Sequence, residues 1–81
     1  MIVFGGFVNG VRTNEIYKFH FPTRKWEHLQ SASVKVPVER AAHSAIVYKD
    51  LLIIFGGKDE ENEKLNDVWA FNLKSYIWEC Y

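Results

Sequence analysis

The chain has 81 residues, 48% hydrophobic and 16% aromatic, so it forms at most one small domain and is too apolar for a disordered protein. Its ten basic and ten acidic side chains cancel, which argues against binding to nucleic acid or an anionic membrane. The longest apolar run, residues 51–55, is far shorter than the roughly 20 residues of a membrane helix.

The predicted elements are seven short strands and essentially no helix, because no long stretch has a 3.6-residue period. In chain order the strands are expected at residues 1–6, 14–21, 25–30, 41–48, 51–57, 66–73 and 76–81. β-branched and aromatic residues are frequent in them, and two of them alternate in the manner of half-buried strands. Loops are expected at 7–13 and 58–65, and a polar connection at 31–40. Shorter turns are expected at 22–24, 49–50 and 74–75.

Two copies of one sequence pattern underlie this order of strands. In each copy an apolar run ends in a glycine pair and is followed by two aromatic residues nine positions apart. Glycine can end a strand because it reaches positive φ without a Cβ clash. The glycine pairs are separated by 51 positions and the aromatics by 52. The matching residues are Gly5, Gly6, Tyr17 and Trp26 in the first copy and Gly56, Gly57, Trp69 and Trp78 in the second.

This period of about 50 residues resembles the kelch repeat, each copy of which is one four-stranded blade of a β-propeller. The resemblance covers nearly the whole chain and implies an all-β fold of about 1.75 antiparallel blades. Residues 1–30 would be an incomplete blade that lacks its innermost strand, residues 31–40 a connection between blades, and residues 41–81 a complete blade. The eight matching residues above, together with His43, are expected to hold the blades together.

Two blades alone would leave apolar faces open, since each blade buries its faces against its neighbours and roughly three or more repeats are needed for stability. We therefore expect a fragment of a larger propeller, or a subunit that closes a ring with other copies. The fragment is favoured, because copies of this chain would each lack the same inner strand. Further kelch blades are thus expected partners in either case.

The alternation of strands places the long loops at one end of the blades and the short turns at the other. Binding residues concentrate on long loops held by a rigid scaffold. The resemblance then implies a protein–protein interaction module, a scaffold or adaptor that binds a partner protein through this loop face. The expected partner-binding residues are Asn9, Arg12, Lys35, Glu39, Arg40, Lys58, Asp59, Glu60, Glu61 and Glu63. The charged run 58–64 is either a solvated loop or a docking patch for a basic peptide.

No catalytic, metal or cofactor site is expected. His43 and Ser44 point to opposite faces of a strand, so His43 cannot activate Ser44. The stretch resembles the Arg-x-x-His-Ser of kelch blades, which implies that Arg40 and His43 tie down the connection. His20 and His28 are only two potential ligands, whereas zinc takes three or four. The chain is therefore predicted not to be an enzyme.

The single cysteine, Cys80, excludes an internal disulfide and favours a reducing, intracellular and cytoplasmic setting. It is interpreted as a small residue packed beside Trp78. The alternative function is purely architectural, with the binding or enzymatic site of the propeller in other blades. The partner, the number of blades and the parent protein are left open, and no BTB or F-box segment indicates a ubiquitin-ligase role.

Overall fold

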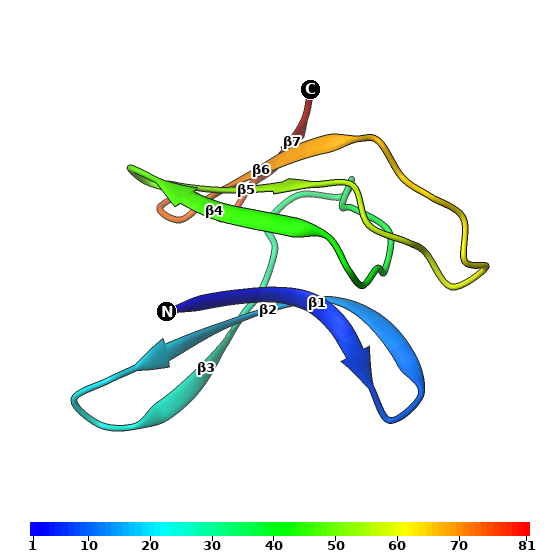
Figure 1. The fold of residues 1–81 in the computed structure, drawn as a ribbon. Helices are drawn as coiled ribbons and strands as arrows, with labels where there is room; N and C mark the ends of the chain where they lie inside the picture. The colour runs from blue at the N-terminus through cyan, green and yellow to red at the C-terminus, as the bar shows by residue number, and fades with distance from the viewer.

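The computed structural model describes all 81 residues and contains seven strands and no helix. The strands are β1 (Ile2–Val8), β2 (Val11–His20), β3 (Lys25–Leu29), β4 (Ser44–Tyr48), β5 (Leu51–Phe55), β6 (Val68–Asn72) and β7 (Trp78–Cys80). They form two antiparallel sheets, of order β1-β2-β3 and β4-β5-β6-β7. Figure 1 shows the four-stranded sheet stacked on the three-stranded one. The predicted all-β fold is confirmed, and the structure has no helix with the length and apolar character needed to cross a membrane.

The first hairpin differs from its prediction, because β1 continues past the glycine pair to Val8. Gly5 and Gly6 have φ of 66° and 103°, and the register shifts between Phe4 and Gly6, so they form a β-bulge within the strand. Asn9 and Gly10 then make a two-residue turn with φ of 51° and 82°, the positive values that a tight type I′ hairpin requires. The loop predicted at 7–13 is therefore mostly strand.

The second glycine pair behaves differently, since β5 ends at Phe55, immediately before it. Residues 58–65 form the predicted long loop, which is held by isolated bridges from Lys58 to Ala41 and to Lys64. The same two-glycine motif thus bends one strand and ends the other. The difference lies in the segment after each pair, a two-residue turn in one repeat and a long charged loop in the other.

The core lies between the two sheets and follows from the alternation of each strand. One face of the first sheet and one face of the second meet there, and the Phe4 and Trp78 rings contact edge to face with centroids 5.2 Å apart. The buried cluster consists of Phe4, Ile16 and Leu29 from the first sheet and Leu52, Ile54, Phe71 and Trp78 from the second. Burial of these side chains is the main favourable term that joins the two repeats.

The outward faces of both sheets are also apolar, but they are exposed. Trp26 and Trp78 occupy the same position in the two repeats, yet Trp26 is 54% exposed and Trp78 only 5%. On the other side, Ile46 and Phe55 of the second sheet are exposed as well. Apolar patches of this kind usually mark interaction surfaces. Each repeat therefore has two apolar faces, and within this chain only one face of each repeat is covered, by the other repeat.

The connections between strands lie at two opposite ends of the sheets (Figure 1). The turns β2–β3, β4–β5 and β6–β7 lie at one end, where Lys74 Nζ is 3.5 Å from the Asp50 carboxylate. The β1–β2 turn, the loop 58–65 and the connection 31–40 reach the opposite end. This second end carries the residues from which a candidate site can be built.

Candidate functional site

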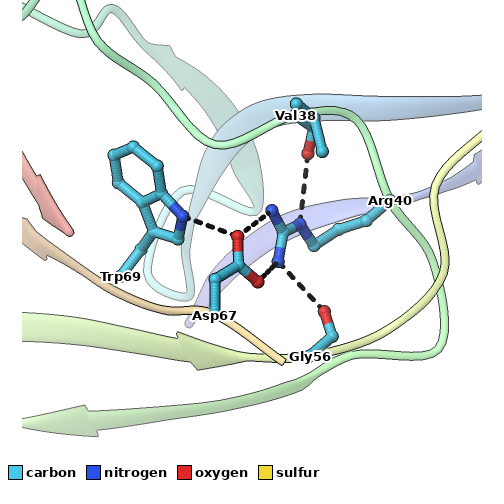
Figure 2. Close-up of polar contacts among 5 residues, drawn as sticks. All are labelled: Val38, Arg40, Gly56, Asp67 and Trp69. Carbon is cyan, nitrogen blue, oxygen red and sulfur yellow. Dashed lines mark hydrogen bonds and ion pairs between the residues drawn. The ribbon is translucent and has the colours of Figure 1, made fainter. Parts of the chain in front are cut away.

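Arg40, the last residue of the connection 31–40, is the centre of a group of buried polar contacts with the second repeat (Figure 2). Its side chain is fully buried, and its guanidinium donates to both Asp67 carboxylate oxygens, from Nη1 at 2.6 Å and from Nη2 at 2.9 Å. Nη1 also donates to the Gly56 carbonyl at 3.0 Å and Nε to the Val38 carbonyl at 3.1 Å. The two parallel bonds to one carboxylate form a bidentate pair, the strongest common arrangement of these groups.

The burial of Arg40 corrects its prediction as a partner-binding residue. The sequence placed Arg40 both in the partner-binding set and among the residues that tie down the connection. In the structure the side chain is 0% exposed and directed into the molecule, so it does not contribute to a partner-binding surface. Its backbone pairs with the first sheet, since Arg40 N–H donates to the Thr13 carbonyl and Gly6 N–H donates to the Arg40 carbonyl. Arg40 therefore connects both repeats.

Asp67 is the residue that sequence reasoning missed. Besides the guanidinium it accepts a hydrogen bond from the Trp69 indole Nε1–H at 2.8 Å. The hydrogen bond from Arg40 is the largest cause that lowers the pKa of the Asp67 carboxyl, and the Trp69 indole acts in the same direction, whereas burial opposes them. The signal that could have found Asp67 is the acidic residue two positions before the aromatic in both repeats, Glu15 in the first and Asp67 in the second.

His43 fills the space beside both glycine pairs. A Cβ at Gly57 would lie 2.9 Å from the His43 Cβ and 2.7 Å from the Ala41 carbonyl oxygen, and one at Gly5 would lie 3.2 Å from His43 Cε1. The imidazole also meets the Phe4 ring edge to face, with centroids 5.4 Å apart. Glycine is therefore required at these positions by contact as well as by positive φ. The structure thus places His43 between the two repeats.

Acidification should destabilise the fold through His43. Burial lowers the pKa of its imidazole from the ordinary value of 6.5, the Arg40 charge lowers it further, and the Phe4 backbone opposes them. The unfolded chain then binds a proton more readily than the folded chain, so the contribution of His43 is present above about pH 6.5 and is lost as the pH falls through the lowered pKa. The urea midpoint should therefore decrease toward acid in this range.

The measurement is a series of urea unfolding curves between about pH 7.5 and about pH 5. His43→Gln should remove most of the slope, because this variant has no group to protonate at that position. His20→Gln is the control, since His20 is the last residue of β2 and its Nε2 lies 2.9 Å from the carboxylate of the exposed Glu27. Equal slopes in the unsubstituted chain and in His43→Gln would show that another group causes the dependence.

The loop face is continuous across the two repeats. The Arg12 backbone N–H donates to Glu60 Oε1 at 2.6 Å, and Arg12 Nη2 donates to Asn62 Oδ1 at 3.2 Å. Within the 58–65 loop, Asp59 Oδ1 accepts from the backbone N–H groups of Glu61 and Glu63, each at 3.0 Å. The first hairpin and the long loop of the second repeat are thus held together. Asn9 and Lys35 are exposed.

A hollow of about 190 Å³ lies on this face, between the connection 31–40 and the long loop. It is lined by Val38, Glu39, Asp59, Glu60 and Glu61. The lining includes four acids and no base, so the hollow has a negative potential despite the zero net charge of the chain. No group of three or more His, Cys, Asp or Glu side chains gathers closely enough to hold a metal ion.

Outside the loop face, two predictions about single residues can be compared with the structure. Cys80 is exposed, so its interpretation as a packed residue is wrong. It lies on β7, an edge strand of its sheet. His20 and His28 are separate, since His20 Nε2 lies 2.9 Å from Glu27 Oε1 and His28 Nε2 lies 3.2 Å from Glu15 Oε2.

Two stacked antiparallel sheets with one repeated strand pattern and a shared core define the class of the chain, which is a pair of β-propeller blades. The family model described as the KLHDC2/KLHL20/DRC7 Kelch-repeats domain matches residues 1–81. The chain therefore belongs to the kelch-repeat family, and the resemblance seen in the sequence is confirmed. Kelch repeats generally mediate protein–protein interactions.

Curated relatives agree with this assignment. The chain is 37% identical over 68 residues to the mouse leucine-zipper-like transcriptional regulator 1, which covers 84% of the chain and 8% of the relative. It is 31% identical over 78 residues to the mouse Kelch domain-containing protein 1, with coverages of 95% and 19%. It is also 29% identical over 82 residues to dynein regulatory complex subunit 7 of Chlamydomonas reinhardtii, with coverages of 96% and 7%. The chain thus spans less than a fifth of each of these relatives.

Proposed function

We propose that the chain supplies neighbouring blades of a kelch propeller that acts as a protein-interaction scaffold or adaptor, and that a partner protein binds at the loop face. The observation that carries the proposal is the acidic hollow formed jointly by the connection and the long loop. Loops on a rigid scaffold commonly carry binding residues. The bond from Arg12 to Glu60 fixes this loop against the first repeat.

The chemistry of the hollow favours a partner segment that carries lysine or arginine. The carboxylates of Glu39, Asp59, Glu60 and Glu61 surround it, and complementary charge across an interface increases the association rate and excludes partners of like charge. Arg40, the buried cation of the chain, is paired with Asp67, and no lysine or arginine lines the hollow.

Neutralising part of the hollow should weaken partner capture without unfolding the chain. In the double variant Glu39→Gln/Glu61→Gln, which leaves the bond from Arg12 to Glu60 in place, we expect capture of a basic partner to fall about tenfold, mainly through slower association. Capture from a cell extract identifies the partner, and surface plasmon resonance at low and high salt then measures its association rate. The unsubstituted chain should show the steeper salt dependence.

A matched control removes two acids elsewhere. Glu27→Gln/Asp50→Asn changes the net charge equally, but Glu27 lies on β3 and Asp50 lies in the β4–β5 turn. Capture should be unchanged in this variant. Equal capture by both double variants would remove the loop face from the proposal and favour an architectural role, with the working site in other blades.

We further propose that this propeller works without catalysis and in a reducing compartment. The exposed thiol of Cys80 supports the second point, because unpaired exposed cysteines are uncommon in oxidising surroundings. A cysteine-labelling assay on the protein in intact cells tests it, and a modified or disulfide-linked Cys80 would oppose it.

A further inference from the structure

The connection between the repeats contains a segment, residues 34–39, whose backbone is unpaired. None of its backbone groups forms a hydrogen bond with another backbone group. The chain is held on both sides of this segment. Ala32 N–H donates to the Tyr76 carbonyl, and Arg40 N–H donates to the Thr13 carbonyl. Unpaired backbone groups at the surface can pair with an extended segment of another chain.

Pro37 sets the orientation of this segment. Its ring is fully buried, and its carbonyl accepts a hydrogen bond from Asn14 Nδ2 at 3.0 Å. Proline favours an extended conformation in the residue before it, and no turn or bend lies next to Pro37. Because alternate residues of an extended chain face the same way, Val36 and Val38 face away from Pro37. They are 38% and 51% exposed, and of their backbone groups only the Val38 carbonyl has a partner, Arg40 Nε.

A hollow lies beside each of these two valines. Val38 lines the acidic hollow of about 190 Å³ between the connection and the long loop. Val36 lines a second hollow of about 220 Å³ between the connection and the first sheet. The apolar lining residues of this second hollow are Ile16, Leu29, Val36 and Trp78, and its amide groups belong to Asn14 and Gln30. Glu15 and His28 also line it, and they are paired with each other at 3.2 Å.

The linings of the two hollows define the side chains that fit them. The acidic hollow suits arginine or lysine, since four acids and no base line it. The second hollow suits tyrosine, because the ring meets the apolar lining while the hydroxyl reaches the amides. When a segment is added as a strand, backbone bonds give affinity and pockets for alternate side chains give specificity. The two hollows match this spacing, because the valines that line them are two positions apart.

We propose that residues 35–39 accept an extended segment of the partner protein as an added antiparallel strand. Antiparallel pairing is the slightly more stable arrangement, and it fixes the order of the partner residues. An arginine or lysine faces Val38 and enters the acidic hollow, and a tyrosine two positions later faces Val36 and enters the second hollow. This inference rests on the proposed function, because it assigns the binding mode and the sequence pattern of a partner at the same loop face.

The test uses the whole chain, labelled with ¹⁵N, and the peptide Thr-Arg-Thr-Tyr-Thr with both ends blocked. At saturating peptide we expect the exchange of the Val36 and Val38 amide protons with water to slow about tenfold or more, because paired amides are protected. Two control peptides are the reversed sequence Thr-Tyr-Thr-Arg-Thr and a form with glutamine in place of arginine, and each should bind about tenfold more weakly. The chain variant Glu39→Gln/Glu61→Gln should also bind the probe more weakly, whereas Glu27→Gln/Asp50→Asn should bind it as the unsubstituted chain does.

The possible results separate this inference from the proposed function. Slowed exchange at Val36 and Val38 that requires the arginine of the peptide supports the added strand. Shifts of the Glu60 and Glu61 amides without slowed exchange would overturn the strand addition and still leave a basic ligand in the acidic hollow. Equal affinity for the probe and either control peptide would overturn the assignment of side chains to the two hollows. A spectrum that the probe leaves unchanged would overturn the inference as a whole, whereas the loop face is tested separately with the captured partner.

Discussion

Replacing Asp67 with asparagine should reduce the free energy of unfolding by about 3–5 kcal/mol, the usual cost of breaking a buried ion pair by removing one partner. Arg40 is fully buried and has Asp67 as its only carboxylate partner. Without that charge, a guanidinium is left in a poorly hydrated position between the repeats. Urea unfolding followed by far-UV circular dichroism measures the loss, provided that the transition is two-state.

The same Asp→Asn change at Asp50 is the matched control. Its partner Lys74 is 3.5 Å away, and both side chains are largely exposed, so the loss should be about 0–1 kcal/mol. The ion pair should also make the free energy of unfolding depend on pH in the acid range. Because the pKa of Asp67 is lowered below its ordinary value of 3.8, its stabilisation is present above about pH 3.8 and is lost as the pH falls further. Equal losses in the two variants would contradict the role assigned to Arg40 and Asp67.

Trp78→Ala should be about as damaging, with a loss of about 3–5 kcal/mol. The Trp78 ring lies within 5.2 Å of Phe4 and 4.9 Å of Phe71, measured between ring centroids. The substitution would therefore leave a cavity at the centre of the core that joins the sheets. The measurement is again urea unfolding of the variant beside the unsubstituted chain.

The repeat supplies the control for this prediction. Trp26 has the same position in the first repeat but lies on the outward face, where it contacts Phe19 and Tyr17. Trp26→Ala should reduce stability by about 1 kcal/mol or less in this chain, because a half-exposed side chain leaves little cavity. A Trp26→Ala loss as large as that of Trp78→Ala would show that the outward face is buried in solution.

The strand pattern and the repeat were predictable because both follow from local features. Alternating apolar residues, glycine pairs and a fixed spacing of aromatics are visible within short windows of sequence. The structure confirms seven strands in two sheets. Alternation alone could not say which face of each strand is covered, since Ile16 and Tyr17 are adjacent and both apolar. The packing of the second sheet decides that Ile16 is buried.

Contacts between distant segments could not be predicted from the sequence. The partner of Arg40 lies 27 positions away, and no local rule indicates that these two side chains meet. The first glycine pair forms a bulge within β1 instead of ending the strand, because the tight Asn9-Gly10 turn follows it. The segment expected to be a loop is therefore part of a longer hairpin. The acidic hollow is formed by Glu39 from the connection and three acids from the loop. The sequence predicts that all four lie on one face, but not that they line one hollow.

Each sheet carries an apolar face that is open in this chain and that another blade would cover. Sedimentation equilibrium of the 81-residue chain across a wide concentration range measures whether these faces associate, with circular dichroism used to verify that strands are present. We expect the folded chain to self-associate as its concentration rises, because Trp26 and Phe55 lie on open faces. A folded chain that stays monomeric at every concentration would contradict the claim.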